Sequence, residues 1–308
     1  NLSSSALGHN ELKLLKMPGR FIFDMFFEVK KGYKLDSYKL NSVSKLYLNG
    51  EEKIDMPAKE MFARFNEEDP IKLREVAEYC IQDTLLPIKL DKKLCIFTNL
   101  LEMAKATWVP IDYLSERGQQ IKVFSQLAKK AKEMGFIIPV IRHGKEPEAS
   151  YVGATVLDAH KGAYYKPITA LDFEGLYPSI MMAHNLCYSS LVMNPKYENI
   201  SGVEYESFKV GDITYKFAQN VDTLLPSILK ELKMFRKQAK RDMSAATGHM
   251  KEVYNGKQLA YKVSMNSVYG FTGAGRGMLP CVPIASSVTL MGRSMIDMTK
   301  NYVEKNFP

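Results

Sequence analysis

The stretch from Ile168 to Asn185, ITALDFEGLYPSIMMAHN, is the part of the sequence from which the fold is most readily predicted. Ile168–Phe173 is a short apolar run with one carboxylate, Asp172, near its end, which predicts a buried strand that delivers an acid to an exposed edge. A Glu-Gly pair at 174–175 interrupts this run, and Pro178 suits the first turn of the apolar helix that follows. The sequence therefore predicts a strand, a tight turn and a helix.

Asp172 has two interpretations at this junction. A carboxylate at the end of a buried strand, beside a tight backbone turn, can hold a hard cation such as Mg²⁺, and the neighbouring backbone N–H groups can face phosphate oxygens. The alternative is structural, because an acid at a strand end or before a helix also serves as a cap. The spacing alone leaves both interpretations open.

The letters of the same stretch resemble a motif of a known enzyme family. The segment 172–179, DFEGLYPS, resembles the first palm motif of family B DNA polymerases, whose usual wording is Asp-x-x-Ser-Leu-Tyr-Pro-Ser. The continuation 180–191, IMMAHNLCYSSL, is similar to polymerases of the delta type and of large DNA viruses. Gly175 stands where the family usually has Ser, so the resemblance implies no side-chain role at this position.

Composition and charge set broad limits on the protein. The 308 residues are 46% hydrophobic and 25% charged, which allows more than one domain. The apolar runs are too short to cross a bilayer and no secretory signal opens the chain, so we expect an intracellular protein without a membrane partner. The net charge of +8 favours a polyanionic partner. The scattered cysteines include no CxxC, which predicts reduced thiols without a zinc or iron–sulfur site.

Periodicity and punctuation predict the remaining elements in outline. We expect helices over 37–47, 56–66, 71–90, 93–106, 115–134 and 284–303, with a break and cap at 67–70. Strand character is expected over 20–29 and 135–140, a hairpin from 151–158 and 161–165, and a β-leaning insertion over 194–218. The polar run 142–149, RHGKEPEA, is the best candidate for a domain boundary, and the Gly-rich run 273–277 is expected to be a turn.

A second motif lies on the helix expected over 71–90. Tyr79 and Asp83 are four residues apart and share a helical face, where they can position a water and a metal ion for phosphodiester hydrolysis. Most such pairs are structural. Upstream of a palm motif, however, the pattern resembles the third exonuclease motif of proofreading family B polymerases, which implies that Asp83 is a metal ligand and Tyr79 orients the water. The two earlier exonuclease motifs are not found in the sequence, and Asp24 is no convincing substitute.

A basic helix is expected over 222–242, with Pro226 in its first turn. Arg236 and Lys240 lie four residues apart on it, and like charges so placed repel by a few tenths of a kcal/mol unless they meet an anion. A solvated basic face is the common alternative. The pattern alone leaves open whether these side chains bind an anion.

A second helix is expected over 251–269, and it carries Lys262, Asn266 and Tyr269 on one stripe. Such a line of side chains suits contacts that run from phosphate to base. The segment 262–270, KVSMNSVYG, resembles in full the family motif Lys-x-x-x-Asn-Ser-x-Tyr-Gly. The resemblance implies two antiparallel finger helices that clamp a triphosphate, with Arg236 and Lys262 as the strongest phosphate contacts.

The resemblance covers the chain from Arg20 to its end and implies an α/β multidomain fold. The late part of an RNase H-like 3′–5′ exonuclease domain (1–141) would be followed by the first part of a polymerase palm (142–220), two-helix fingers (221–272) and a second, incomplete part of the palm (273–308). The implied reaction is template-directed addition of deoxynucleoside triphosphates to a primer 3′-OH in DNA replication, with proofreading. The implied partners are primer–template DNA, a deoxynucleoside triphosphate, a sliding clamp and accessory subunits.

The resemblance also implies roles for individual residues. Asp172 and the Phe173 carbonyl would hold Mg²⁺ in a two-metal polymerase site, and Asp83 would belong to a second metal site for the exonuclease. Leu176 and Tyr177 would support the triphosphate through backbone N–H groups, and the Tyr177 ring would reject a 2′-OH. The other implied contacts are to the nucleotide, from Arg236, Lys240, Lys262, Asn266 and Tyr269, and to DNA, from Tyr151, Gly153 and Gly270. A strand-turn explanation of 151–154, which resembles the Tyr-x-Gly-Gly/Ala template loop, stays open.

Two other functions stay open at this stage. The protein could be a nuclease with a degenerate synthesis site, or a non-catalytic DNA-binding scaffold that uses the basic helices. The location implied by the family is the nucleus for a cellular protein or the infected host cell for a viral one.

We expect that the isolated chain does not extend a primer. The family needs a further pair of aspartates in a Tyr-Gly-Asp-Thr-Asp hairpin, and this string does not occur in the sequence, which we interpret as an internal fragment. One carboxylate cannot hold two metal ions. Incubating the isolated chain with primer–template, Mg²⁺ and four nucleotides measures this directly, and detectable extension would contradict the expectation.

Overall fold

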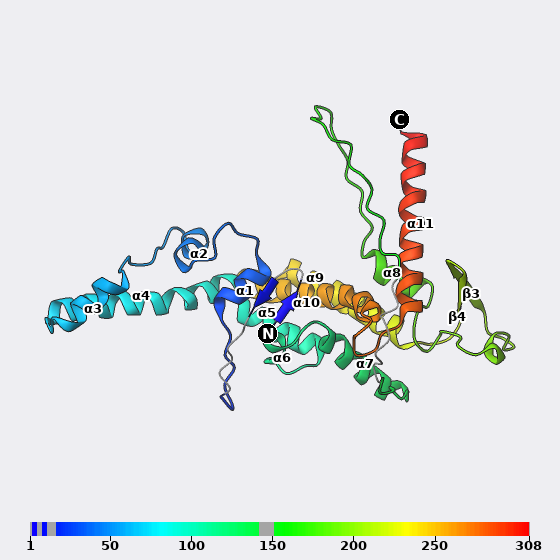
Figure 1. Cartoon of the computed structure of the whole chain (residues 1–308), viewed down its shortest axis with the longest axis horizontal. Coiled ribbons are helices and arrows are strands. Elements are labelled where there is room, and N and C mark those ends of the chain that lie inside the picture. The colour runs from blue at the N-terminus through cyan, green and yellow to red at the C-terminus, as the bar shows by residue number, and fades with distance from the viewer. Residues whose placement is uncertain (1, 5–7, 11–16, 142–150, 308) are drawn as a thin grey trace. The chain divides into compact units, whose positions relative to one another are not determined.

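The computed structural model describes residues 2–4, 8–10, 17–141 and 151–307, and it is mainly helical (Figure 1). The chain divides into two compact units, which are described separately below. The first unit comprises Asn1–Glu102 and Leu114–Glu116, and the second comprises Met103–Tyr113 and Arg117–Pro308. The predicted boundary at 142–149 lies outside the described residues, so the predicted domain limits stay predictions.

The first unit contains short strands and four helices of its own. Its elements are β1 (Leu2–Ser4) and β2 (Gly8–Asn10), which pair antiparallel, followed by α1 (Met25–Gly32), α2 (Leu40–Tyr47), α3 (Ala58–Asn66), α4 (Pro70–Leu94) and the first part of α5 (Ile96–Thr107). The helices predicted over 37–47, 56–66, 71–90 and 93–106 are thus confirmed, with shifts of a few residues at their ends.

Helix α1 corrects the strand predicted over 20–29. The backbone N–H of Phe26 donates to Asp24 Oδ1 at 2.9 Å, so the aspartate caps the helix that follows it. Glu28 lies in the first turn and Lys31 in the last, which suits the helix dipole. Asp24, the acid that interrupts the apolar run, therefore caps the start of a helix. The strand interpretation gave this acid no structural role.

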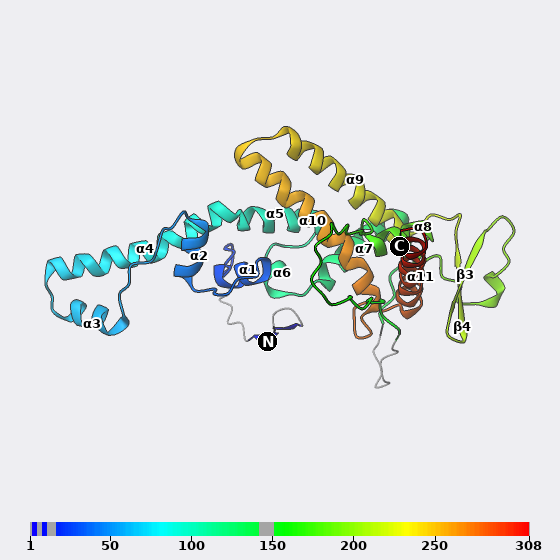
Figure 2. The ribbon, with the colours of Figure 1, turned by 90° about the horizontal axis from the view of Figure 1, so that it is seen from above.

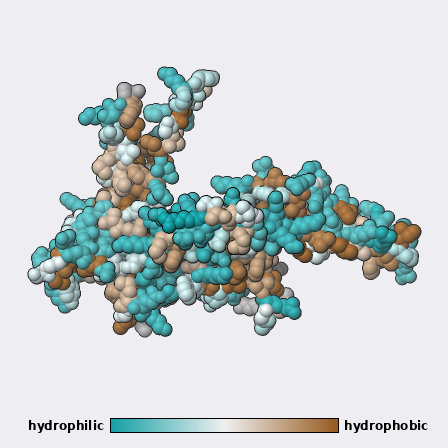
Figure 3. Space-filling model, turned by 180° about the vertical axis from the view of Figure 1, so that it is seen from behind, coloured by the Kyte–Doolittle hydropathy of each residue, from teal (hydrophilic) through white to brown (hydrophobic). Residues whose placement is uncertain are grey.

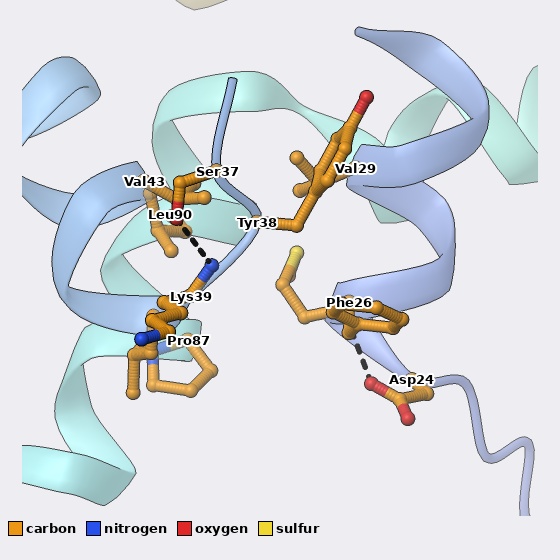
Figure 4. A pocket seen from close by; sticks show the side chains of 11 residues that line it. Asp24, Phe26, Val29, Ser37, Tyr38, Lys39, Val43, Pro87 and Leu90 are labelled. Atoms are coloured by element: carbon orange, nitrogen blue, oxygen red, sulfur yellow. Dashed lines mark hydrogen bonds between the residues drawn. The ribbon is translucent and has the colours of Figure 1, made fainter. Parts of the chain in front are cut away.

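Helix α4 begins as the sequence predicts but is buried only near its end. The side chain of Asp69 accepts from the Ile71 N–H at 2.9 Å, and Pro70 occupies the first helical position. Leu86 and Leu90 are fully buried. Leu90 borders a cavity of about 600 Å³, which α1, α2 and α4 line with mostly apolar side chains (Figure 4).

The other end of this unit has apolar side chains at its surface. Phe62 and Phe65 of α3 are each 61% exposed, and Ile71 of α4 is 71% exposed. Figure 3 shows hydrophobic surface among the hydrophilic surface over these two helices. The core of the unit is therefore small and lies among α1, α2, the end of α4 and the start of α5.

The second unit is built from helices with one small hairpin of strands. Its elements include α7 (Gln120–Met134), α8 (Leu176–Ala183), a 3₁₀ turn (Pro195–Tyr197), β3 (Tyr205–Val210), β4 (Ile213–Ala218), α9 (Leu224–Ala245), α10 (Gly248–Gly273) and α11 (Val282–Asn306). The short α6 (Tyr113–Glu116) begins in this unit, and its last three residues belong to the first unit. Helices α9 and α10 are joined by a short turn and run antiparallel (Figure 2). The predicted helix pair and the strand character within 194–218 are confirmed.

The core of the second unit contains buried side chains from α7, α8, α9, α10 and α11. Its fully buried side chains include Leu127 of α7, Met181 of α8, Leu225 of α9, Val268 of α10 and Ile284 of α11. Helix α7, which the sequence assigns to the part before residue 142, thus packs in one core with the elements that follow it. The compact units and the predicted functional domains therefore divide the chain at different places.

Several predicted strands are wrong for the described residues. No strand is assigned over 135–140, 151–158, 161–165 or 168–173. Ile168 and Leu171 are each 71% exposed, although the prediction placed them in a buried strand. A strand needs a neighbour for its backbone N–H and C=O groups, and in the described part of this unit the one strand pair is β3 with β4. The predicted α/β palm is therefore not seen among these residues.

A buried amide joins three elements of the second unit. Nδ2 of Asn185 donates to the carbonyl oxygens of Ala218 at 2.9 Å, Gln219 at 3.2 Å and Val221 at 3.0 Å. Its Oδ1 accepts from the Thr223 hydroxyl. Asn185 itself has a φ of 45°, a conformation that Asn tolerates better than most residues. One side chain thus ties the end of α8 to the end of β4 and the start of α9.

We expect Asn185→Gly to lower the free energy of unfolding by about 1–3 kcal/mol, because buried carbonyl groups and a hydroxyl lose their partner. Glycine keeps the left-handed backbone angle, so the loss reports on the amide. Urea unfolding followed by circular dichroism measures it. The control is Asn301→Gly, at an exposed position of α11, which we expect to cost less than about 1 kcal/mol. Equal losses in the two variants would contradict the role of the Asn185 amide.

Candidate nucleotide and nucleic-acid site

The turn after Asp172 has the conformation that its glycine suggests. Gly175 has φ 59° and ψ 55° and forms the N-terminal boundary of α8, which begins at Leu176. The hydroxyl of Ser179 donates to the Glu174 carbonyl at 3.2 Å and steadies this turn. Asp172 is exposed and lies in an extended segment just before the turn. The predicted turn and helix are confirmed, while the strand before them is not formed.

Arg236 of α9 lies near this turn. Its Nη1 is 4.0 Å from Glu174 Oε1, and its Nε donates to Gln258 Oε1 at 3.4 Å. The Arg236 side chain is mostly buried, whereas that of Glu174 is 83% exposed. The structure therefore brings the segment that follows Asp172 and the basic face of α9 together, although the sequence separates them by more than sixty residues.

The other predicted phosphate contacts lie on the same antiparallel helix pair. Lys240 of α9 is exposed one turn beyond Arg236, and Lys262 and Asn266 are exposed one turn apart on α10. Neither Lys240 nor Lys262 forms an ion pair with another described residue. These side chains are thus free to meet a polyanion, and their positive charge has no acidic partner within the described part of the chain.

Three tyrosines predicted separately from the sequence meet beside these helices. The ring centroids of Tyr177 and Tyr269 are 4.4 Å apart, and the hydroxyl groups of Tyr269 and Tyr151 share a hydrogen bond of 3.1 Å. Burial, followed by the hydrogen bond with Tyr151, raises the pKa of Tyr269 well above its usual range. The Tyr269 phenol is therefore harder to ionise than a free tyrosine, and the bond persists to a higher pH.

Two glycines that the sequence did not indicate as site residues make room for the tyrosines. A Cβ on Gly273 would lie 2.2 Å from the Tyr151 hydroxyl, and a Cβ on Gly292 would lie 3.1 Å from the Tyr177 ring. By contrast, a Cβ on Gly270 would meet nothing within 4 Å. The Gly-rich run after α10 is a signal that could have singled out Gly273, whereas no local pattern marks Gly292.

The predicted exonuclease pair meets a lysine in the first unit. Lys53 Nζ lies 2.9 Å from Asp83 Oδ2 and 4.8 Å from the centroid of the Tyr79 ring. Hydrogen bonding to Tyr79, and then to Asp83, raises the pKa of Lys53. Oδ1 of Asp83 is buried and has no hydrogen-bond partner. Tyr79 and Asp83 thus share a helical face as predicted, and an ammonium group that the sequence did not indicate neutralises the acid.

The residues described here do not by themselves make a site for a resident metal ion. Among them there is no group of three or more His, Cys, Asp and Glu side chains that could hold one. Asp172 is exposed without a neighbouring acid cluster, and Asp83 is paired with Lys53.

In the described ranges, no helix is long and apolar enough to span a bilayer.

Comparisons with known proteins place the chain in a family. The model of DNA polymerase family B matches residues 109–308. The chain is 45% identical to a DNA polymerase of Paramecium bursaria Chlorella virus NY2A, with all of the chain and 34% of that protein covered. It is 44% and 43% identical to DNA polymerase delta catalytic subunits of Caenorhabditis elegans and Bos taurus, with 28% of each covered. The chain thus spans about a third of the length of these relatives.

We expect Gly273→Ala to lower the free energy of unfolding by about 1–3 kcal/mol, because the new methyl group overlaps the Tyr151 hydroxyl. Chemical denaturation measures the change. Gly270→Ala, on the same helix with open space around it, is the matched control and should be neutral or stabilise the helix by up to about 1 kcal/mol. An equal response of the two variants would show that Tyr151 does not pack against α10 as described.

Proposed function

Since this chain belongs to DNA polymerase family B, we propose that it is part of a replicative DNA polymerase that adds deoxynucleoside triphosphates to a primer 3′-OH under the direction of a template. The observation that carries the proposal is the meeting of three features in one unit. These are the turn after Asp172, the basic face of α9 and α10, and the tilted ring pair of Tyr177 and Tyr269.

We assign the phosphate contacts to the helix pair α9 and α10. A triphosphate carries several negative charges, and Arg236, Lys240 and Lys262 offer cations from two neighbouring helices. A guanidinium group recognises phosphate through paired N–H donors, and an ammonium group does so as a compact charge. Arg236 is held only loosely, at 4.0 Å, by the exposed Glu174. A phosphate oxygen can therefore replace this carboxylate with little cost.

The start of α8 adds neutral donors to the same proposed site. The first N–H groups of a helix lack partners within it, so those of Leu176 and Tyr177 can face an anion. In this proposal the Tyr177 ring lies under the sugar, where a 2′-OH would collide with it. Asn266 and Tyr269 lie further along α10 towards the base, and Gly270, with open space around it, lets DNA approach the helix.

Mg²⁺ is the metal that membership of the family implies for this reaction. We propose that Asp172 and the Phe173 carbonyl supply ligands to it from this chain. The described residues hold no complete set of ligands, so the remaining oxygen ligands would come from the triphosphate and from carboxylates elsewhere in the protein.

The other parts of the chain fit a longer replicative enzyme. We propose that 1–141 belongs to a 3′–5′ exonuclease domain, 142–220 and 273–308 to the palm, and 221–272 to the fingers. Tyr79 and Asp83 would serve the exonuclease, with Lys53 as the present counter-ion of Asp83. Tyr151 and Gly153 would contact template DNA. A sliding clamp, accessory subunits and a nuclear or infected-cell location remain expectations from the family.

We expect Lys262→Ala to raise the apparent KM for the nucleotide about tenfold or more, which corresponds to about 1.4 kcal/mol of lost phosphate binding. Steady-state primer extension by the longer protein that contains this sequence measures it. Lys237→Ala, at an exposed position of α9, is the control and should leave KM unchanged.

The same variants separate the polymerase from a DNA-binding scaffold. If the basic helices bind only duplex DNA, Lys262→Ala weakens DNA binding and its salt dependence while the nucleotide KM stays constant. That result would contradict the proposed function of the α9–α10 pair.

A further inference from the structure

We propose that Arg293 and Thr289, on α11, are positioning residues that hold the backbone after Tyr151 and thereby fix the tyrosine wall of the nucleotide pocket. The inference rests on the proposed function, because it assigns to α11 a part in nucleotide selection. The tyrosine wall is defined here as Tyr151, Tyr269 and Tyr177.

The contacts from α11 to the segment after Tyr151 are close and convergent. Nη1 of Arg293 donates to the carbonyl oxygens of Val152 at 2.9 Å and Gly153 at 2.8 Å. The Thr289 hydroxyl donates to the same Val152 carbonyl at 2.9 Å. Arg293 and Thr289 are four residues apart and share one face of the helix. Two consecutive peptide carbonyls thus accept hydrogen bonds from one turn of α11.

Side-chain contacts connect the backbone held by Arg293 and Thr289 to the proposed nucleotide site. The Tyr151 hydroxyl bonds that of Tyr269 at 3.1 Å, and the Tyr269 ring lies 4.4 Å from that of Tyr177. Gly292, between the two gripping residues, lets α11 approach the Tyr177 ring, because a Cβ there would lie 3.1 Å from it. Helix α11 therefore contacts the backbone next to Tyr151 and the ring of Tyr177.

Arg293 is suited to this task by its charge. A hydrogen bond from a guanidinium group to a carbonyl oxygen is stronger than one between neutral groups. No described carboxylate forms an ion pair with Arg293, so its donors are not drawn towards an acid. The carbonyl oxygens of Val152 and Gly153 accept the hydrogen bonds that a carboxylate would otherwise accept.

The segment 151–173 depends on these contacts for its attachment. It has no helix or strand, and in Figure 1 it is the green chain that leads to α8. In the described ranges, the hydrogen bonds that join this segment to α10 and α11 all involve the Tyr151 hydroxyl or the carbonyl oxygens of Val152 and Gly153. Asp172 lies at the other end of the same segment. Loss of Arg293 would therefore loosen the tyrosine wall and the approach to Asp172.

The test uses Arg293→Met in the longer protein and measures kcat/KM for a deoxynucleotide and for the matching ribonucleotide. We expect the ratio of the two values to fall by about fivefold or more, the size of a modest coupling between linked sites. Arg293→Lys, which keeps a charged donor, should recover part of the selectivity. Lys300→Met, another loss of a cation on α11, is the control and should leave the ratio unchanged.

A double-mutant cycle with Tyr151→Phe distinguishes positioning from general destabilisation. If Arg293 acts through the Tyr151 hydroxyl, the double variant should have the selectivity of Tyr151→Phe alone. Additive effects of the two changes, or unchanged selectivity in Arg293→Met, would overturn the proposal.

Limited proteolysis tests the attachment without relying on catalysis. We expect Arg293→Met to speed tryptic cleavage after Lys161 severalfold, because the segment 151–173 loses its hydrogen bonds to Arg293, while cleavage within α9 and α10 stays unchanged. An unchanged rate of cleavage after Lys161 would overturn the proposal. If the unmodified protein fails to extend primers, the proposed function fails, and the cleavage data still show whether Arg293 holds this segment.

Discussion

The buried amide of Asn185 is the interaction on which the geometry of the second unit depends. It donates to three carbonyl groups near the end of β4 and accepts from Thr223 at the start of α9. Helix α8, which follows the turn after Asp172, ends just before this residue. The amide therefore sets where the basic face of α9 lies relative to that turn. A shift there would move Arg236 away from Glu174.

The site is assembled from segments that are far apart in sequence and have different physical tasks. The helix pair α9 and α10 concentrates positive charge, and the start of α8 presents N–H groups that lack partners. The tyrosines between them supply shape and no charge, because a phenol is neutral at physiological pH. In the proposed function these parts would bind an anionic nucleotide through charge and select it through shape. Such a division explains why the cations are exposed while the rings are packed.

Local patterns predicted most of the helices, and the family resemblance supplied the candidate site residues. Contacts between residues far apart in sequence account for most of what was missed. Asp69 followed by Pro70 marked the start of α4 correctly, because capping needs only neighbouring residues. Asp24 was misjudged, since an apolar run with one acid suits a strand and a capped helix alike. The run before Glu174 has strand composition, but no described strand lies beside it to pair with its backbone. The contacts of Lys53 with Asp83 and of Arg293 with Val152 join residues that no spacing rule connects.

The most direct test of the account is single-turnover nucleotide incorporation by the longer protein with Asp172→Asn. The account predicts that the rate of incorporation falls by at least about a thousandfold, while the affinity for primer–template stays within a factor of two. The amide keeps the size of the side chain and removes its charge, so this outcome would assign the carboxylate to the chemistry. Incorporation within tenfold of the unmodified protein would contradict the account, because Asp172 would then be a structural acid beside a turn.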